Sequence, residues 1–374
     1  MPVIQIQPRL KQQVKKVSEV LNIHPFILDL CNQDCTQDEL LIPGFFLNES
    51  DFRAERIDSF AHLEELVKES EKTRDNWAGE RNVYNSKIIE KDLQKIIELF
   101  PFVRYRVIGH SVLGKPIHEL TIGDAGAPKS VHINASFHAN EWITTSVLMK
   151  WCKEFLVSLC TNEKHFGLFP IEQFKQTKIS LVPLVNPDGV DLVLNGPDHV
   201  NFDTDTLLSI NEHQPDFNEW KANIRGVDLN NQFPSFWEIE QQRKPKSPSY
   251  RDYPGYAPLT EPEAIAMSNL AEKSQFDRLL ALHTQGEEIY WGYKGFEPEQ
   301  SQKTVELFGS LSGYKPVRNL DSYAGYRDWY VHRYSKEGYT IELGKGKNPL
   351  PFAQFEEIFQ KTRGILWTSL SFAD

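Results

Sequence analysis

Residues 130–142 read Ser-Val-His-Ile-Asn-Ala-Ser-Phe-His-Ala-Asn-Glu-Trp and contain the strongest indication of the fold. Residues 130–137 predict a strand, and the apolar residues 142–160 predict a long helix. Strands that alternate with helices indicate an α/β domain from about residue 83 to the end. The other predicted strands cover residues 178–186, 277–283 and 338–343, and the other predicted helices lie near 85–99, 261–274, 299–311 and 352–370.

Length and charge restrict the function classes. The chain has 374 residues, which suits one large domain with an appendage, or two domains. It carries 41 Lys and Arg against 52 Asp and Glu, a net charge of −11, which argues against nucleic acid as a partner. No apolar run approaches the roughly 18 residues of a membrane span, so no membrane partner is expected. Residues 1–16 lack the apolar core of a signal peptide, so we expect a cytoplasmic protein; a forespore or wall-associated location is the alternative.

The cysteines are too few and too unevenly spaced for a disulfide framework. We expect all of them to be reduced, as in a reducing cytoplasm. They are Cys31, Cys35, Cys152 and Cys160.

Residues 1–48 predict a small α+β unit that precedes the main domain. Two short apolar helical faces, around Val17 and Ile27, are followed by Leu-Leu-Ile-Pro-Gly-Phe-Phe at 40–46. This outline resembles a LysM module, which implies binding of cell-wall glycan; a helical appendage without that role is the alternative. Residues 49–82 are dense in charge and predict a helical linker.

Four predicted strands end at a polar side chain that could carry chemistry. They end at or just before His138, Asn186, His283 and Glu342. Ligands of open α/β sheets bind beyond the carboxyl ends of the strands, so these side chains mark the expected site. An imidazole and a carboxylate in His138-Ala139-Asn140-Glu141, completed by His283, would give the His₂Glu set of a hydrolytic zinc site. Taken alone, the His-x-x-Glu spacing is weak evidence for a metal site, and a polar loop without a metal is the alternative.

Further motifs follow in order along the chain. They are Val107 to Ile117, Asn186-Pro187-Asp188-Gly189, Gly226-Val227-Asp228-Leu229-Asn230, Leu280-Ala281-Leu282-His283-Thr284 and Tyr339-Thr340-Ile341-Glu342-Leu343. In order and approximate spacing these resemble the zinc carboxypeptidase superfamily over about residues 83–374. The resemblance implies a three-layer α/β/α sandwich around a mixed, mostly parallel eight-stranded sheet.

The resemblance also implies roles for individual residues. His138, Glu141 and His283 match the ligands of one zinc ion, and Glu342 matches the carboxylate that accepts a proton from the zinc-activated water and returns it to the leaving amine. Arg225 matches the arginine that stabilises the developing oxyanion, with a surface ion pair as its alternative.

The sequence departs from the exopeptidase pattern where the substrate's terminal carboxylate is held. Digestive-type members use an Asn-Arg pair, whereas here Asn230 is followed by Asn231, and Asn140 stands where the His-x-x-Glu motif commonly has Arg. A neutral amide cannot form the bidentate pair that fixes a carboxylate. Tyr323 and Tyr326 are the two choices for the tyrosine of a mobile loop.

These departures resemble the branch of γ-D-glutamyl-L-diamino acid endopeptidases. The resemblance implies cleavage of the γ-D-glutamyl bond to meso-diaminopimelate, or to lysine, in peptidoglycan peptides. Two other interpretations stay open. One is a conventional zinc carboxypeptidase or small-molecule amidohydrolase of the same fold. The other is a catalytically silent protein that binds peptidoglycan, against which the complete set of His138, Glu141, His283 and Glu342 argues.

Overall fold

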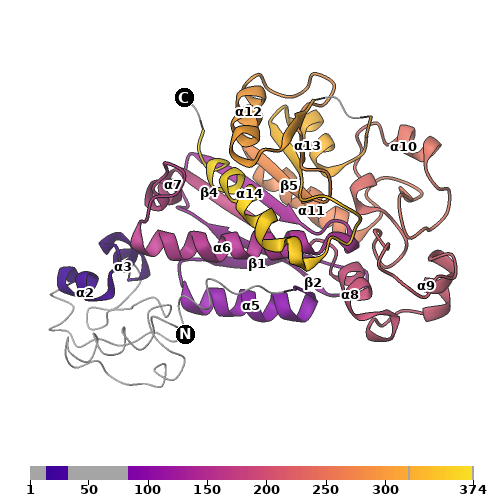
Figure 1. Ribbon diagram of the computed structural model, residues 1–374, viewed down its shortest axis with the longest axis horizontal. Helices are drawn as coiled ribbons and strands as arrows, with labels where there is room; N and C mark the ends of the chain where they lie inside the picture. Colours follow the sequence, from indigo (N-terminus) through magenta and orange to yellow (C-terminus); the bar gives the residue numbers. More distant parts are fainter. Residues whose placement is uncertain (1–13, 33–82, 319–320, 373–374) are drawn as a thin grey trace.

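A twisted eight-stranded sheet forms the centre of the described protein (Figure 1). The computed structural model describes residues 14–32, 83–318 and 321–372. The strand order is β1-β2-β4-β3-β5-β8-β6-β7. The strands are β1 (Arg104–His110), β2 (Pro116–Ile122), β3 (Lys129–Ala135), β4 (Thr177–Val182), β5 (Arg278–His283), β6 (Glu288–Tyr290), β7 (Lys315–Val317) and β8 (Glu337–Glu342).

The four central strands run parallel, and antiparallel pairs flank them. β4, β3, β5 and β8 pair in parallel, while β1 with β2, β2 with β4 and β6 with β8 pair antiparallel. The carboxyl ends of β3, β5 and β8 therefore meet at one edge of the sheet. The register pairs His283 with Glu342 directly. The sheet thus brings residues from distant parts of the sequence to one place before any loop is considered.

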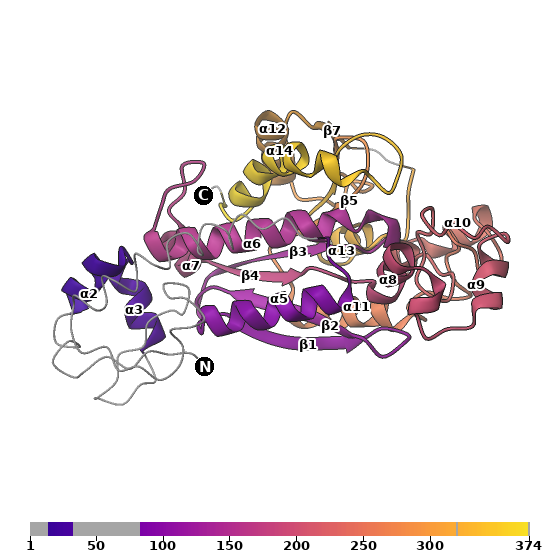
Figure 2. The same ribbon diagram turned by 60° about the horizontal axis from the view of Figure 1, so that its bottom comes forward.

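Helices cover both faces of the sheet, which confirms the predicted three-layer sandwich (Figure 2). Side chains of β5 alternate between two cores. Leu280 and Leu282 join the core that contains residues of α5 (Ser86–Leu99), α6 (Ile143–Thr161) and α14 (Phe355–Thr368). Leu279 and Ala281 join the core formed with α11 (Pro262–Ser274) and α13 (Tyr326–Tyr334). A strand that is buried on both faces is apolar throughout, which is why its sequence shows no polar alternation.

Five of the described helices, at residues 86–99, 143–161, 262–274, 300–312 and 355–368, agree with the predicted helices to within a few residues. The helices are α2 (Val14–Leu21), α3 (Pro25–Cys31), α5 (Ser86–Leu99), α6 (Ile143–Thr161), α7 (Pro170–Gln176), α8 (Pro187–Asn195), α9 (Thr204–Ile210), α10 (Trp237–Arg243), α11 (Pro262–Ser274), α12 (Gln300–Ser312), α13 (Tyr326–Tyr334) and α14 (Phe355–Thr368), with short 3₁₀ turns η3 (Ala139–Glu141), η4 (Pro197–His199), η5 (Leu229–Asn231) and η6 (Phe352–Gln354). Among the described helices none is long and apolar enough to cross a membrane.

The two described N-terminal helices pack at the end of the molecule that is remote from α8 to α10 (Figure 2). The His24 N–H donates to the Cys160 carbonyl at the end of α6, and the Phe26 ring meets the Phe174 ring edge to face. The 19 residues of α6 separate this contact from the turn η3 by roughly 27 Å. The described helices α2 and α3 therefore lie a helix length from η3. The predicted strand at 40–46 and the linker at 49–82 fall outside the described residues.

Candidate metal centre and its cavity

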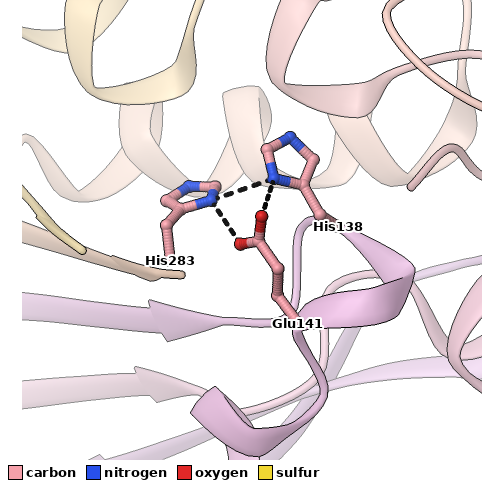
Figure 3. Close-up of side chains that lie close together, drawn as sticks. All are labelled: His138, Glu141 and His283. Carbon is pink, nitrogen blue, oxygen red and sulfur yellow. Dashed lines mark hydrogen bonds and ion pairs between the residues drawn. The ribbon is translucent and has the colours of Figure 1, made fainter. Parts of the chain in front are cut away.

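Two imidazoles and one carboxylate converge at the carboxyl ends of β3 and β5 (Figure 3). His138 and Glu141 flank the turn η3, and His283 ends β5. The Nδ1 atom of His138 lies 2.8 Å from Glu141 Oε1, and the Nδ1 atom of His283 lies 2.9 Å from Glu141 Oε2. The two Nδ1 atoms are 3.1 Å apart. The predicted ligand set is thus assembled, and all three residues are buried.

The donor geometry fits a tetrahedral cation. Zinc with nitrogen and oxygen ligands at about 2.0–2.2 Å holds those ligand atoms roughly 3.3–3.6 Å from each other, so the donors found here at 2.8–3.1 Å need to separate by only a few tenths of an ångström. His138 Nε2 lies 3.2 Å from Asp228 Oδ1, so this nitrogen carries the proton and its Nδ1 lone pair is left for a metal. A carboxylate that orients a histidine in this way is the usual second partner of a metal ligand.

Charge and backbone contacts hold Glu141 ionised at the centre. The Thr284 N–H donates to Glu141 Oε2 at 3.1 Å. Although burial opposes the charge, the His138 and His283 imidazoles hold the pKa of Glu141 well below its usual range. For His138, burial is outweighed by the charges of Glu141 and Asp228, which raise its pKa. The site therefore presents an anion to whatever cation it binds.

The Asn186-Pro187-Asp188-Gly189 motif supports the ligand turn rather than the substrate. The Asn186 side-chain amide donates to the carbonyls of Phe137 and Ala222 and caps α8 by accepting from the Gly189 N–H. A Cβ at Gly189 would lie 2.8 Å from the Cβ of Ala139 in η3 and 2.7 Å from the Ala222 carbonyl. Glycine here permits α8 to approach the turn that carries His138 and Glu141.

Glu342 ends β8 beside His283 and faces the same cavity. Burial, followed by the neighbouring Glu141 carboxylate, raises the pKa of Glu342 to about 8. A bound dication would lower this pKa again because it stabilises the carboxylate form. A carboxyl group whose pKa lies near neutrality can both accept and return a proton, which is the property that a general base and acid needs.

The cavity in front of this cluster has a volume of about 410 Å³. Its walls include metal-site, catalytic and cationic side chains from several loops. Those used below are His138, Glu141, Glu342, Asn140, Lys221 and Arg251.

The structure places Lys221, rather than the predicted Arg225, at the wall of the cavity. The guanidinium of Arg225 is half exposed and lies 3.5 Å from Glu261, which is the surface ion pair considered as the alternative. The ammonium of Lys221 lines the cavity and lies 3.0 Å from Asp228 Oδ2. Burial opposes its charge, but Asp228 and Asp252 raise the pKa of Lys221, so it is an ammonium at neutral pH.

Sequence reasoning missed Lys221 although it lies in the same short run as Arg225. The one signal was its place directly after Trp220, a fully buried side chain that anchors the loop. The main chain of Lys221 is also tied to the metal turn, since its carbonyl accepts from the Ala139 N–H at 3.0 Å.

Of the predicted substrate-binding asparagines, only Asn140 lines the cavity. Its Oδ1 has no hydrogen-bond partner among the described residues. Asn230 caps the start of α13, where its Oδ1 accepts from the Tyr326 N–H, and Asn231 is buried with its Oδ1 bonded to Lys244 Nζ at 2.7 Å. The Lys244 ammonium also lies 3.3 Å from the buried carboxylate of Glu240, which in addition accepts from Nε and Nη2 of Arg243.

The two predicted loop tyrosines lie in different surroundings. Tyr326 is fully buried, with its hydroxyl 3.4 Å from the Met267 carbonyl, so its assignment to substrate binding is wrong. It begins α13 and packs against Phe137 as part of the core. Tyr323 lines a neighbouring hollow with Lys294 and Arg318 and is absent from the walls of the metal-site cavity.

Comparison with known proteins places this geometry in a family. The sequence profile of the family described as zinc carboxypeptidase matches residues 89–312, which include both histidines and Glu141. The chain belongs to the zinc carboxypeptidase family. It is therefore a zinc metallopeptidase by family, and the cluster of His138, Glu141 and His283 is its candidate zinc site.

Relatives and solved structures agree with this membership. The chain is 54% identical over its whole length to "Uncharacterized protein YqgT" of Bacillus subtilis, with 99% of that protein covered. It is 46% identical to "Gamma-D-glutamyl-L-diamino acid endopeptidase 1" of Lysinibacillus sphaericus, over 78% of this chain and 73% of the relative.

The fold is shared with distant carboxypeptidases. Bovine thrombin-activatable fibrinolysis inhibitor is 18% identical with a TM-score of 0.60, over 76% of this chain and 95% of the other. Carboxypeptidase A from Helicoverpa armigera is 18% identical with a TM-score of 0.57, over 82% and 80% of the two chains. At this identity the similarity confirms the carboxypeptidase-like sandwich and carries no conclusion about substrate.

Proposed function

We propose that this zinc metallopeptidase is an endopeptidase that cleaves the γ-D-glutamyl bond to meso-diaminopimelate, or to lysine, in peptidoglycan peptides. The observation that carries the proposal is the environment of Asn231, the position at which digestive-type members have the arginine that holds the terminal carboxylate. An exopeptidase needs a cation there to pair with a terminal carboxylate, whereas position 231 carries a buried neutral amide whose oxygen accepts from Lys244. The 46% identity to an endopeptidase named for the same bond supports this choice.

His138, Glu141 and His283 would hold the zinc ion, since their donor atoms converge and Asp228 orients one imidazole. A bound zinc ion supplies a Lewis acid that polarises the scissile carbonyl and acidifies a water molecule. The carboxylate of Glu342 accepts the proton of the attacking water and returns it to the leaving amine. The ammonium of Lys221 stabilises the charge that develops on the carbonyl oxygen.

The proposed setting is a reducing compartment, the cytoplasm or forespore, where wall fragments are processed. The two cysteines of α6 support it, because Cys152 and Cys160 are free and buried. A glycan-binding role of residues 1–48 remains part of the proposal. The described helices of that segment lie far from the metal site, so such binding would act by delivering substrate rather than by shaping the cavity.

The test is cleavage of L-Ala-γ-D-Glu-meso-diaminopimelate by the full chain, with and without a chelator, followed by mass spectrometry. We expect release of free diaminopimelate, its loss on chelation and its return on addition of zinc. A matched peptide with an ordinary α-linked glutamyl residue serves as control. Faster cleavage of that control would contradict the endopeptidase assignment and favour a conventional carboxypeptidase.

A further inference from the structure

An alternating chain of charges connects the metal site to the rim of the cavity. His138 Nε2 lies 3.2 Å from Asp228 Oδ1, and Asp228 Oδ2 lies 3.0 Å from Lys221 Nζ. Lys221 Nζ then lies 3.2 Å from Asp252 Oδ1, and Asp252 Oδ2 lies 3.0 Å from Arg251 Nε. Lys221 and Arg251 both line the cavity. Arg251 is thus the outer cation of a chain whose inner end is a zinc ligand.

The backbone around Arg251 is fixed to the wall of the site. The Tyr250 carbonyl accepts from the N–H groups of Lys221 and Ala222, and the Asp228 N–H donates to the Tyr253 carbonyl. Asp252 adopts a left-handed backbone with φ 66°, a conformation that is uncommon outside glycine and that persists only where the surroundings hold it. Arg251 therefore projects from a braced segment rather than from a free loop.

The guanidinium of Arg251 retains unused donors. Its Nε contacts Asp252, and neither terminal nitrogen has a hydrogen bond to another residue in the described parts of the chain. Its side chain is 49% exposed on the cavity. By contrast Lys347, another cation on the rim, is paired with Glu219. A guanidinium with free terminal nitrogens matches a carboxylate bidentately.

We propose that Arg251 determines specificity by binding the free α-carboxylate of the γ-linked glutamyl residue, with Asp252 as its positioning residue. In a γ-glutamyl residue the reacting carbonyl and the α-carboxylate are separated by three carbons. The two cations, Lys221 for the carbonyl oxygen and Arg251 for the carboxylate, are separated by a single carboxylate with an ion-pair contact at each end. An α-linked residue with a neutral side chain offers no carboxylate at that distance from the reacting carbonyl. The inference rests on the proposed function and names the feature of its substrate that is recognised.

The test compares two peptides that differ at one group. L-Ala-γ-D-Glu-meso-diaminopimelate carries the α-carboxylate, and its D-isoglutaminyl analogue carries a neutral amide there. For the zinc-loaded full chain we expect kcat/KM to favour the acid by about 10- to 100-fold, the range of a charge-assisted hydrogen bond. In Arg251→Gln this ratio should fall to near one. Arg251→Lys should restore part of it, because lysine keeps the charge but lacks the paired N–H donors of the guanidinium.

Arg225→Gln is the matched control, because its side chain is 50% exposed and lies outside the cavity. It should keep the wild-type ratio. Equal loss of activity on both peptides in Arg251→Gln, or a wild-type enzyme that shows no preference, would overturn the inference while leaving the proposed function intact. Cleavage of neither peptide by the zinc-loaded wild type would instead refute the proposed function and this inference with it.

Discussion

Replacing Lys221 by methionine tests whether the cation of this site is the lysine or the arginine four positions later. Methionine keeps much of the aliphatic volume and removes the charge. Besides burial and the Glu141 charge, the Lys221 ammonium acts on the pKa of both Glu342 and His138, where it favours the ionised carboxylate and opposes the imidazolium. Its charge is therefore felt at the reacting centre.

The expected loss has a catalytic and a structural part. Removing one group that stabilises the developing oxyanion lowers kcat by about 10²- to 10³-fold in other acyl-transfer enzymes. Removing Lys221 also leaves Asp228 without its ion pair, although Asp228 keeps the His138 imidazole and the Asn230 N–H. Because Lys221 is 20% exposed, we expect a loss of about 1–3 kcal/mol in the free energy of unfolding, less than for a fully buried pair.

The assay measures kcat/KM on the γ-D-glutamyl tripeptide, zinc content and thermal unfolding for Lys221→Met, Lys221→Arg and Arg225→Met. Zinc content separates a loss of chemistry from a loss of the metal through Asp228 and His138. We expect Lys221→Arg to retain most of the activity because the charge remains. An Arg225→Met enzyme that falls as far as Lys221→Met, or a Lys221→Met enzyme with normal turnover, would refute the reasoning.

Three further predictions follow from single contacts. Glu342→Gln should lower kcat/KM by about 10²- to 10⁴-fold with zinc content unchanged, and a loss no larger than that of a surface change such as Glu357→Gln would remove its assigned role. Asp228→Asn should weaken zinc binding about 10- to 100-fold, measured by competition with a chelator, since it alters the partner of His138 Nε2; unchanged affinity would contradict that orienting role. Burial raises the pKa of Glu263 to about 7 from its ordinary value near 4.5, so the folded state binds more protons than the unfolded state between these values and stability falls as pH rises through them. Glu263→Gln should therefore be near neutral at pH 5 and stabilise by about 2–3 kcal/mol at pH 8 in denaturant titrations, and a gain that does not depend on pH would contradict the charge as its cause.

Much of the fold could be predicted from the sequence because local patterns are strong there. Strands buried on both faces give apolar runs, and β5 and β8 end at the residues where those runs stop. Parallel pairing then places the ends of neighbouring strands together, so that His283 and Glu342 meet by register alone. The prediction was wrong at the end of β4. This strand ends at Val182 rather than at the predicted residue 186, because Asn186 caps α8.

Sequence patterns predicted the candidate zinc ligands and Glu342, because these residues lie at strand ends or in a compact turn where spacing fixes position. The tertiary structure alone decided which cation faces the site. Lys221 and Arg225 lie in one irregular loop without a period, so their directions depend on distant partners, Asp228 and Glu261. The same holds for Tyr326, whose place at the start of α13 turns its ring into the core against Phe137. Side-chain direction in loops is set by long-range packing and ion pairing, which a linear pattern does not record.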